Sequence, residues 1–145
     1  MESESNSDST RKLASVQVVD SVRKHPNADK LEIVTILGWE VITRIGEAKQ
    51  AQVVVYCEVD ALLPVTADWL PPAVKDLIAD QSKDLEFFRI KTRKLRGELS
   101  QGLIVTEIPS VPFADLPIGT DLTEKLGVEK FSQHFLGFLH TYILC

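Results

Sequence analysis

Residues 31–59 read LEIVTILGWEVITRIGEAKQAQVVVYCEV and contain three segments with the pattern of β-strands. Apolar and polar residues alternate from Leu31 to Leu37, as they do in a strand with one buried face. A tight Leu-Gly-Trp connection leads into a second segment, which ends at Ile45. The third segment, Gln52–Val59, is rich in β-branched residues and nearly continuous, which suits a strand that is buried on both faces or closes a barrel. These three segments predict a β-rich fold.

The chain before these segments adds one more expected strand. Apolar residues recur among polar ones from Leu13 to Val22, and the sequence His-Pro-Asn-Ala-Asp at residues 25–29 is typical of a turn. The expected order at this end of the chain is therefore one strand, one turn and then the three segments described above.

The chain after residue 59 is expected to mix strands with short helices. Pro71 and Pro72 can open a helix, on which Val74, Leu77 and Ile78 would share one face. Two further segments alternate and are predicted to pair with each other as strands: residues 88–94 and residues 103–108. Thr120 is expected to cap a short helix that ends at Gly127.

Five to six short strands with few helices indicate an all-β fold with minor α content. We expect a five-stranded OB-fold, a Greek-key barrel, with a capping helix and a C-terminal helix. The number of strands alone does not separate an OB-fold from an SH3-like barrel. The chain has 145 residues, which suggests a single domain of ordinary size.

Three regions are expected along the chain. Residues 1–10 are polar and predict a disordered tail, residues 11–130 form the OB-fold domain, and residues 131–145 form an apolar C-terminal tail. In this tail Phe131, Phe135, Phe138 and Tyr142 fall on one helical face. Such a face can dock on a partner or a membrane surface, or pack on its own barrel, and the tail can also be a chance peptide from splicing or a shifted frame. The tail is too short to span a bilayer.

The charge of the chain is unevenly distributed. The net charge is −5, but residues 1–10 contain three acidic and no basic residues, so the remainder carries −2. Five of the sixteen basic residues lie between Arg89 and Arg96. A basic stripe on a nearly neutral body can still attract a polyanion, because the local potential steers binding.

In an extended strand, Arg89, Lys91 and Arg93 would share one face, while Phe88, Ile90 and Thr92 would face a core. The stripe is either a surface that follows nucleic-acid phosphates or a solvated edge strand whose charges prevent aggregation. The segments Arg96-Gly97 and Ser100-Gln101-Gly102 add donor groups and tight backbone, which favours binding. The list of candidate contacts therefore extends to Lys94, Arg96, Ser100 and Gln101.

Three further residues are candidates for contact with nucleic acid. Trp39 could stack on a base, or it could pack in the core or at its rim. His25 could bond to a phosphate or ribose, or could stabilise its own turn, and Lys30 closes that turn. Cys57 is expected to be a small core residue of a reduced, intracellular protein. We find no metal-ligand spacing, no nucleophile pair and no K-x-D-G sequence, so the chain is not expected to be catalytic on its own.

Two segments resemble the N-terminal OB domain of the Deinococcus/Naegleria-type RNA ligases. The first is HPNADKLEIVTILGWEVITRIGEAKQAQVVVYCEVDALLP at residues 25–64. The second is FRIKTRKLRGELSQGLIVTEI at residues 88–108, followed by LPIGTDLTEKLGVEKF. The pattern is also similar to the tRNA-binding OB domain of phenylalanyl-tRNA synthetase beta subunits. Gly38–Val41 and Val55–Asp60 favour the ligase branch.

The resemblance implies an RNA-binding OB module of an ATP-dependent ligase that joins RNA 3′-OH and 5′-phosphate ends. ATP and Mg²⁺ or Mn²⁺ are implied only for the adenylyltransferase domain, which this chain is expected to lack. The expected partners are RNA (single-stranded, nicked or tRNA-like) and a catalytic domain. Three alternatives remain: a tRNA-binding module, a non-functional truncated product and a complete enzyme. The chain departs from the family at residues 49–52, Lys-Gln-Ala-Gln, where a Val-Gly-Asp-type turn is usual, and in its last stretch.

Overall fold

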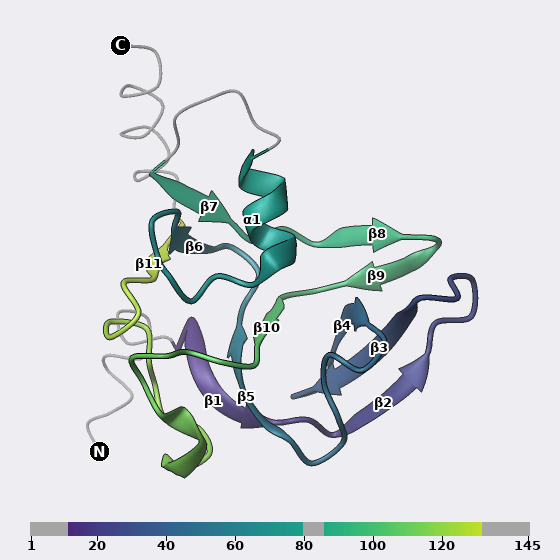
Figure 1. The fold of residues 1–145 in the computed structure, drawn as a ribbon, viewed down its shortest axis with the longest axis horizontal. Helices are drawn as coiled ribbons and strands as arrows, with labels where there is room; N and C mark the ends of the chain where they lie inside the picture. Colours follow the sequence, from purple (N-terminus) through teal and green to yellow (C-terminus); the bar gives the residue numbers. More distant parts are fainter. Residues whose placement is uncertain (1–11, 80–85, 132–145) are drawn as a thin grey trace.

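The computed structural model describes residues 12–79 and 86–131, and these form a β-rich domain with one α-helix (Figure 1). The elements in chain order are β1 Ala14–Val18, β2 Ser21–Lys24, β3 Leu31–Ile36, β4 Trp39–Arg44, β5 Val53–Cys57, β6 Ala61–Pro64, α1 Pro72–Ala79, β7 Phe87–Arg89, β8 Arg93–Leu95, β9 Glu98–Ser100, β10 Leu103–Val105, the 3₁₀ helix η2 Phe113–Asp115 and β11 Glu129–Lys130. The predicted fold class, all-β with minor α, is confirmed. The predicted tail at residues 1–10 and most of the predicted C-terminal helix lie outside the described residues.

The strands pair as four small sheets, in the orders β1-β5-β10, β2-β3-β4, β11-β6-β7 and β8-β9. Strands β4 and β9 lie next to each other but do not pair as neighbours in one sheet. The Ile42 amide donates to the Ser100 hydroxyl, and the amide of Gln101, just after β9, donates to the Glu40 carbonyl at 2.8 Å. The sheets of the expected Greek-key barrel therefore do not close completely. The order β1/β2, β3, β4, β9/β10, β5 and back to β1 is that of a partly open five-stranded OB-fold.

Strand β5 is the centre of the domain. Its Val55 and Cys57 belong to one hydrophobic cluster, and its Val54 and Tyr56 belong to a second cluster on the opposite face. This confirms that the β-branched run is a strand buried on both faces. Cys57 is fully buried and is therefore the small core residue that the sequence predicts. Its burial raises the pKa of the thiol to about 12.

The first predicted strand is divided into β1 and β2, because its two halves pair with different partners. Strand β1 is antiparallel to β5, and β2 is antiparallel to β3. The chain bends at Val19 and Asp20, whose amides donate to the Gln52 and Thr35 carbonyls respectively. The two halves of the predicted strand therefore belong to two different sheets.

The predicted pairing of residues 88–94 with residues 103–108 is wrong. The first segment is interrupted, since β7 ends at Arg89 and β8 begins at Arg93, and β8 pairs with β9 instead. Strand β10 pairs with β5, which is much earlier in the chain. Ile90 is buried as expected, but Thr92 is exposed. The segment is interrupted because the backbone of Ile90 bonds to a different part of the chain: its carbonyl accepts from the Asp60 amide, and its amide donates to the Ala61 carbonyl.

Helix α1 forms where the two prolines predict it, and its Val74 packs into the core. The helix predicted from Thr120 to Gly127 is not formed. Asp121 instead bridges to Ser15, and the Thr123 hydroxyl accepts hydrogen bonds from the Leu13 and Ala14 amides. Pairing with β1 therefore holds this segment in turns.

The unusual sequence at residues 49–52 still makes a tight turn. The Gln52 amide donates to the Lys49 carbonyl, and the Lys49 amide donates to the Gln52 side-chain oxygen. Ala51 has a φ of 69°, in the left-handed region that favours glycine. Its amide donates to the Val19 carbonyl, which fixes this conformation.

We expect Ala51→Gly to stabilise the domain by about 0.5–1 kcal/mol, because glycine adopts a positive φ without the steric cost of a Cβ. Urea unfolding followed by tryptophan fluorescence measures the change. The matched control is Ala73→Gly in the first turn of α1, which should destabilise the domain by a similar amount, because helical residues lose stability when replaced by glycine. A loss of stability in Ala51→Gly would contradict the interpretation.

Candidate nucleic-acid interface

The β8–β9 hairpin and the loop between β2 and β3 lie at the same side of the domain (Figure 1). The loop, residues 25–30, joins the first and second strands of the OB-fold. In the hairpin, β8 and the turn end the long connection between the fourth and fifth strands, and β9 begins the fifth strand. In OB-folds these two connections, together with the face of the second and third strands, form the binding surface for oligonucleotides. The geometry therefore places the candidate site at this side.

The loop contacts the hairpin through two side chains. The His25 ring nitrogen Nε2 lies 2.9 Å from the Leu95 carbonyl oxygen, and the Asn27 side-chain amide donates to the Arg96 carbonyl oxygen at 2.9 Å. The Asn27 backbone amide donates to His25 Nδ1 at 2.9 Å. Since Nδ1 accepts a hydrogen bond, the proton of the neutral ring is on Nε2, which donates to Leu95.

His25 is 1% exposed, and both of its ring nitrogens are engaged in these hydrogen bonds. Of the two roles considered for it, the structure supports stabilisation of the turn. The sequence pattern did not single out Asn27, because asparagine is common in turns for local reasons. Its long-range contact with Arg96 has no signal in the sequence.

The predicted stripe is not a single row of cations. Arg89 is in β7, where its guanidinium forms an ion pair with Asp60 at 2.8 Å and lies 3.5 Å above the centre of the Phe131 ring. The prediction that Arg89 shares a strand face with Lys91 and Arg93 is wrong, because the strand ends between them. Arg89 thus ties β7 to the β5–β6 connection and to the chain after β11.

The other four cations of the stripe are exposed on the hairpin or just before it: Lys91, Arg93, Lys94 and Arg96. Within residues 12–79 and 86–131, none of their side chains takes part in a hydrogen bond or an ion pair with another side chain. Lys24 and Lys30, at the two sides of the neighbouring loop, are also exposed. Six cations are therefore available to solvent around the hairpin and the loop.

Ser100 and Gln101 have structural roles. The Ser100 hydroxyl is buried and accepts the Ile42 amide hydrogen at 2.9 Å. The backbone of Gln101 links two strands, because its amide donates to Glu40 and its carbonyl accepts a hydrogen bond from the Tyr56 hydroxyl at 2.7 Å. Burial raises the pKa of this hydroxyl. These contacts fix the base of the hairpin against β4 and β5.

The connection between β3 and β4 presents apolar side chains to solvent. Trp39 is 43% exposed and Leu37 is 54% exposed, so packing in the core does not explain Trp39. Leu37 has a φ of 54° and is followed by Gly38 with a φ of 83°. An exposed indole ring can stack on a nucleic-acid base, and this role for Trp39 stays a prediction.

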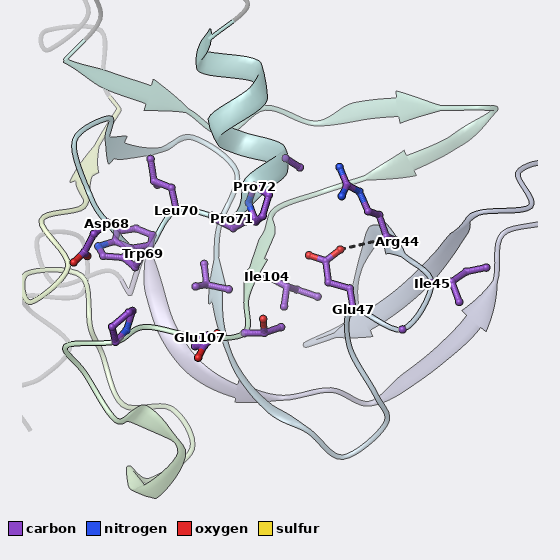
Figure 2. Close-up of a pocket in the computed structure, with 15 residues that line it drawn as sticks. Arg44, Ile45, Glu47, Asp68, Trp69, Leu70, Pro71, Pro72, Ile104 and Glu107 are labelled. Carbon is purple, nitrogen blue, oxygen red and sulfur yellow. Dashed lines mark hydrogen bonds between the residues drawn. The ribbon is translucent and has the colours of Figure 1, made fainter.

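A pocket of about 470 Å³ lies between the end of β4, the chain before α1 and β10 (Figure 2). Trp69, Leu70 and Pro71 form an apolar wall, and the charged residues at the pocket are Arg44, Glu47, Asp68 and Glu107. Three acidic groups against one basic group disfavour a phosphate here. The hairpin side is therefore a better candidate for phosphate binding than this pocket.

The ligase resemblance implies a metal for the adenylyltransferase domain, and the described residues offer no site for it. Among residues 12–79 and 86–131, no group of three or more His, Cys, Asp or Glu side chains could hold a metal ion. The sequence also contains no Asp-Gly pair, which the K-x-D-G nucleophile sequence requires. In the same part of the chain, no helix has the length and apolar character needed to cross a bilayer.

These features, the strand order and the two connections at one side, define an OB-fold domain. The profile of the OB-fold domain family matches residues 13–107, which is more than half of the chain. The chain belongs to this family.

Two kinds of relative are similar to this chain. Structures of the Naegleria gruberi RNA ligase, one of a mutant with AMP and manganese and one with pyrophosphate, superpose with a TM-score of 0.69 at 30% sequence identity. They match 84% of this chain and 36% of the ligase chain. The phenylalanine–tRNA ligase beta subunit of Geobacter sulfurreducens is 30% identical over 129 residues, which are 79% of this chain and 13% of the subunit. Both resemblances predicted from the sequence are confirmed, and the chain spans about a third of the RNA ligase.

Proposed function

We propose that this OB-fold domain binds RNA along the β8–β9 hairpin and the neighbouring β2–β3 loop, as the RNA-holding module of an ATP-dependent RNA ligase. The observation that carries the proposal is the group of solvent-available cations on the two connections that OB-folds use for oligonucleotides: Lys24, Lys30, Lys91, Arg93, Lys94 and Arg96. The similarity to the Naegleria RNA ligase supports RNA as the polyanion.

The proposed mechanism is electrostatic positioning. Exposed lysine and arginine side chains contact phosphates and set the path of the strand, and they read little sequence. Trp39 adds a surface on which a base can stack. In a ligase, such a module would hold the RNA close to the catalytic domain and so raise the effective concentration of the ends, without chemistry of its own. An intracellular site of action follows from this role.

We expect the affinity for single-stranded RNA to fall with salt. If four of the six cations each neutralise one phosphate and release about 0.7 counterions, the slope of log K against log [salt] is about −3. Fluorescence anisotropy of a labelled RNA, titrated between about 50 and 200 mM salt, measures the slope. An affinity that does not change with salt, or the absence of binding at low salt, would refute the proposal.

The second candidate function is tRNA binding, which the similarity to the phenylalanine–tRNA ligase beta subunit favours. Competition separates the two, since a ligase module should prefer a nicked duplex or a single strand, and a tRNA module should prefer folded tRNA. Incubation with labelled ATP and Mn²⁺ tests for an enzyme in its own right. A covalent AMP adduct on the chain would show that it is a ligase and not only a binding module.

A further inference from the structure

The turn of the β8–β9 hairpin has an unfavourable residue at its first position. Leu95 pairs with Glu98, so the turn consists of Arg96 and Gly97. Both residues have positive φ angles, 53° and 88°. A two-residue turn with this geometry strongly favours Asn, Asp or Gly at its first position, because a Cβ disfavours left-handed backbone. The turn nevertheless contains arginine.

The hairpin has little stability of its own. Its strands have three residues each, and a two-stranded hairpin of this size is at best marginally stable in water. Apart from the pairing between β8 and β9, the hydrogen bonds that hold its tip to other described residues come from His25 and Asn27. The bonds of Ser100 and Gln101 hold its base. The position of the tip cations therefore depends on the loop.

Asn27 acts on the unfavourable residue itself. Its side-chain amide donates to the carbonyl oxygen of Arg96 at 2.9 Å, and a Cβ added at Gly97 would lie 3.5 Å from the same amide nitrogen. This contact holds the left-handed peptide in place from outside the hairpin. The Arg96 side chain is exposed, with no hydrogen bond or ion pair to any residue in the described ranges. Local strain that is supported by a neighbour and serves no packing role is typical of a functional position.

We infer that Asn27 is a positioning residue for RNA binding: it holds Arg96 in the left-handed turn, so that Arg96 and Lys94 are fixed for contact with RNA phosphates. The inference rests on the proposed RNA binding and assigns the order of the cationic hairpin to a residue of a different loop. In this role Asn27 acts through Arg96 and not through a contact of its own with RNA. His25 supports it, because its Nδ1 accepts the Asn27 backbone amide hydrogen.

The test compares Asn27→Ala with Arg96→Asn and with the wild-type chain, in the salt titration of single-stranded RNA. Asn27→Ala should weaken binding about 25-fold at about 0.1 M salt and make the salt slope shallower by about 1.4, because two phosphate contacts are lost when the tip moves freely. Arg96→Asn should weaken binding less than Asn27→Ala and make the salt slope shallower by about 0.7, because one phosphate contact is lost. It should also raise the melting temperature, because asparagine is favoured at the first position of this turn. The matched control, Ala28→Gly, loosens the same loop and leaves the Asn27 amide in place.

Each outcome separates the two hypotheses. If the wild-type chain binds no RNA, the proposed function fails and the inference fails with it. If the wild-type chain binds and Asn27→Ala keeps its affinity and slope, the inference alone is overturned. A loss of affinity with an unchanged slope, or an equal effect in Ala28→Gly, would show a general structural role for the loop and would also overturn it.

Discussion

Gly102→Ala should lower the free energy of unfolding by about 3–5 kcal/mol, the range of severe core defects. A Cβ at this position would lie 2.5 Å from Cε1 and from the hydroxyl oxygen of Tyr56. The ring has no free space, because Tyr56 is 1% exposed and its hydroxyl is bonded to the Gln101 carbonyl. The φ of Gly102 is also 113°, which adds backbone strain for any other residue. Urea unfolding measures the loss.

Two variants separate the overlap with Tyr56 from the backbone strain. Gly38→Ala has a φ of 83° and no atom within 4 Å of its added Cβ, so it should cost only about 1 kcal/mol. Tyr56→Leu combined with Gly102→Ala should be less unstable than the sum of the two single changes, because the shorter side chain removes the overlap. Equal losses in Gly102→Ala and Gly38→Ala would show that strain alone is responsible.

The strands were predictable from the sequence where the pattern is local. The alternation in β3, the tight Leu37-Gly38 connection and the double burial of β5 follow from side-chain periodicity within a few residues. The same holds for α1, which the two prolines and the spacing of the apolar residues predict. The division of the first predicted strand into β1 and β2 was not predictable, since the bend between them depends on which other strands they pair with.

Pairings between distant residues account for the errors at the candidate site. Arg89 was expected to face solvent, but its guanidinium contacts both Asp60, which lies 29 positions earlier, and the ring of Phe131. Gly102 was interpreted as tight backbone close to RNA, while its absent side chain makes room for Tyr56. The His25 and Asn27 contacts join residues about 70 positions apart, and a single sequence contains no signal for them. The exposed cations of the hairpin were predictable from the clustering of basic residues in the sequence, because a charged side chain that lies in solvent depends on no distant partner.

Lys94→Glu combined with Arg93→Glu should weaken the binding of single-stranded RNA by about 100-fold or more at low salt. At about 0.1 M salt, the release of 0.7 counterions per contact corresponds to about 1 kcal/mol, and an acidic residue replaces that attraction with repulsion of similar size. The salt slope should become shallower by about 1.4, since two contacts are removed. Both side chains are exposed, so the free energy of unfolding should change by less than about 0.5 kcal/mol.

The matched control is Lys49→Glu combined with Lys125→Glu, which changes the net charge of the chain by the same amount. Both lysines are exposed, one on the connection between β4 and β5 and one on the turns before β11. These two segments lie away from the β8–β9 hairpin (Figure 1). If the site is the hairpin, this control should bind RNA within a few-fold of the wild-type affinity and keep its salt slope, because distant charges are screened beyond about 10 Å at this salt concentration. Equal losses in the two double variants would mean that net charge alone governs binding, and the hairpin would then be a solvated edge whose cations keep the domain soluble.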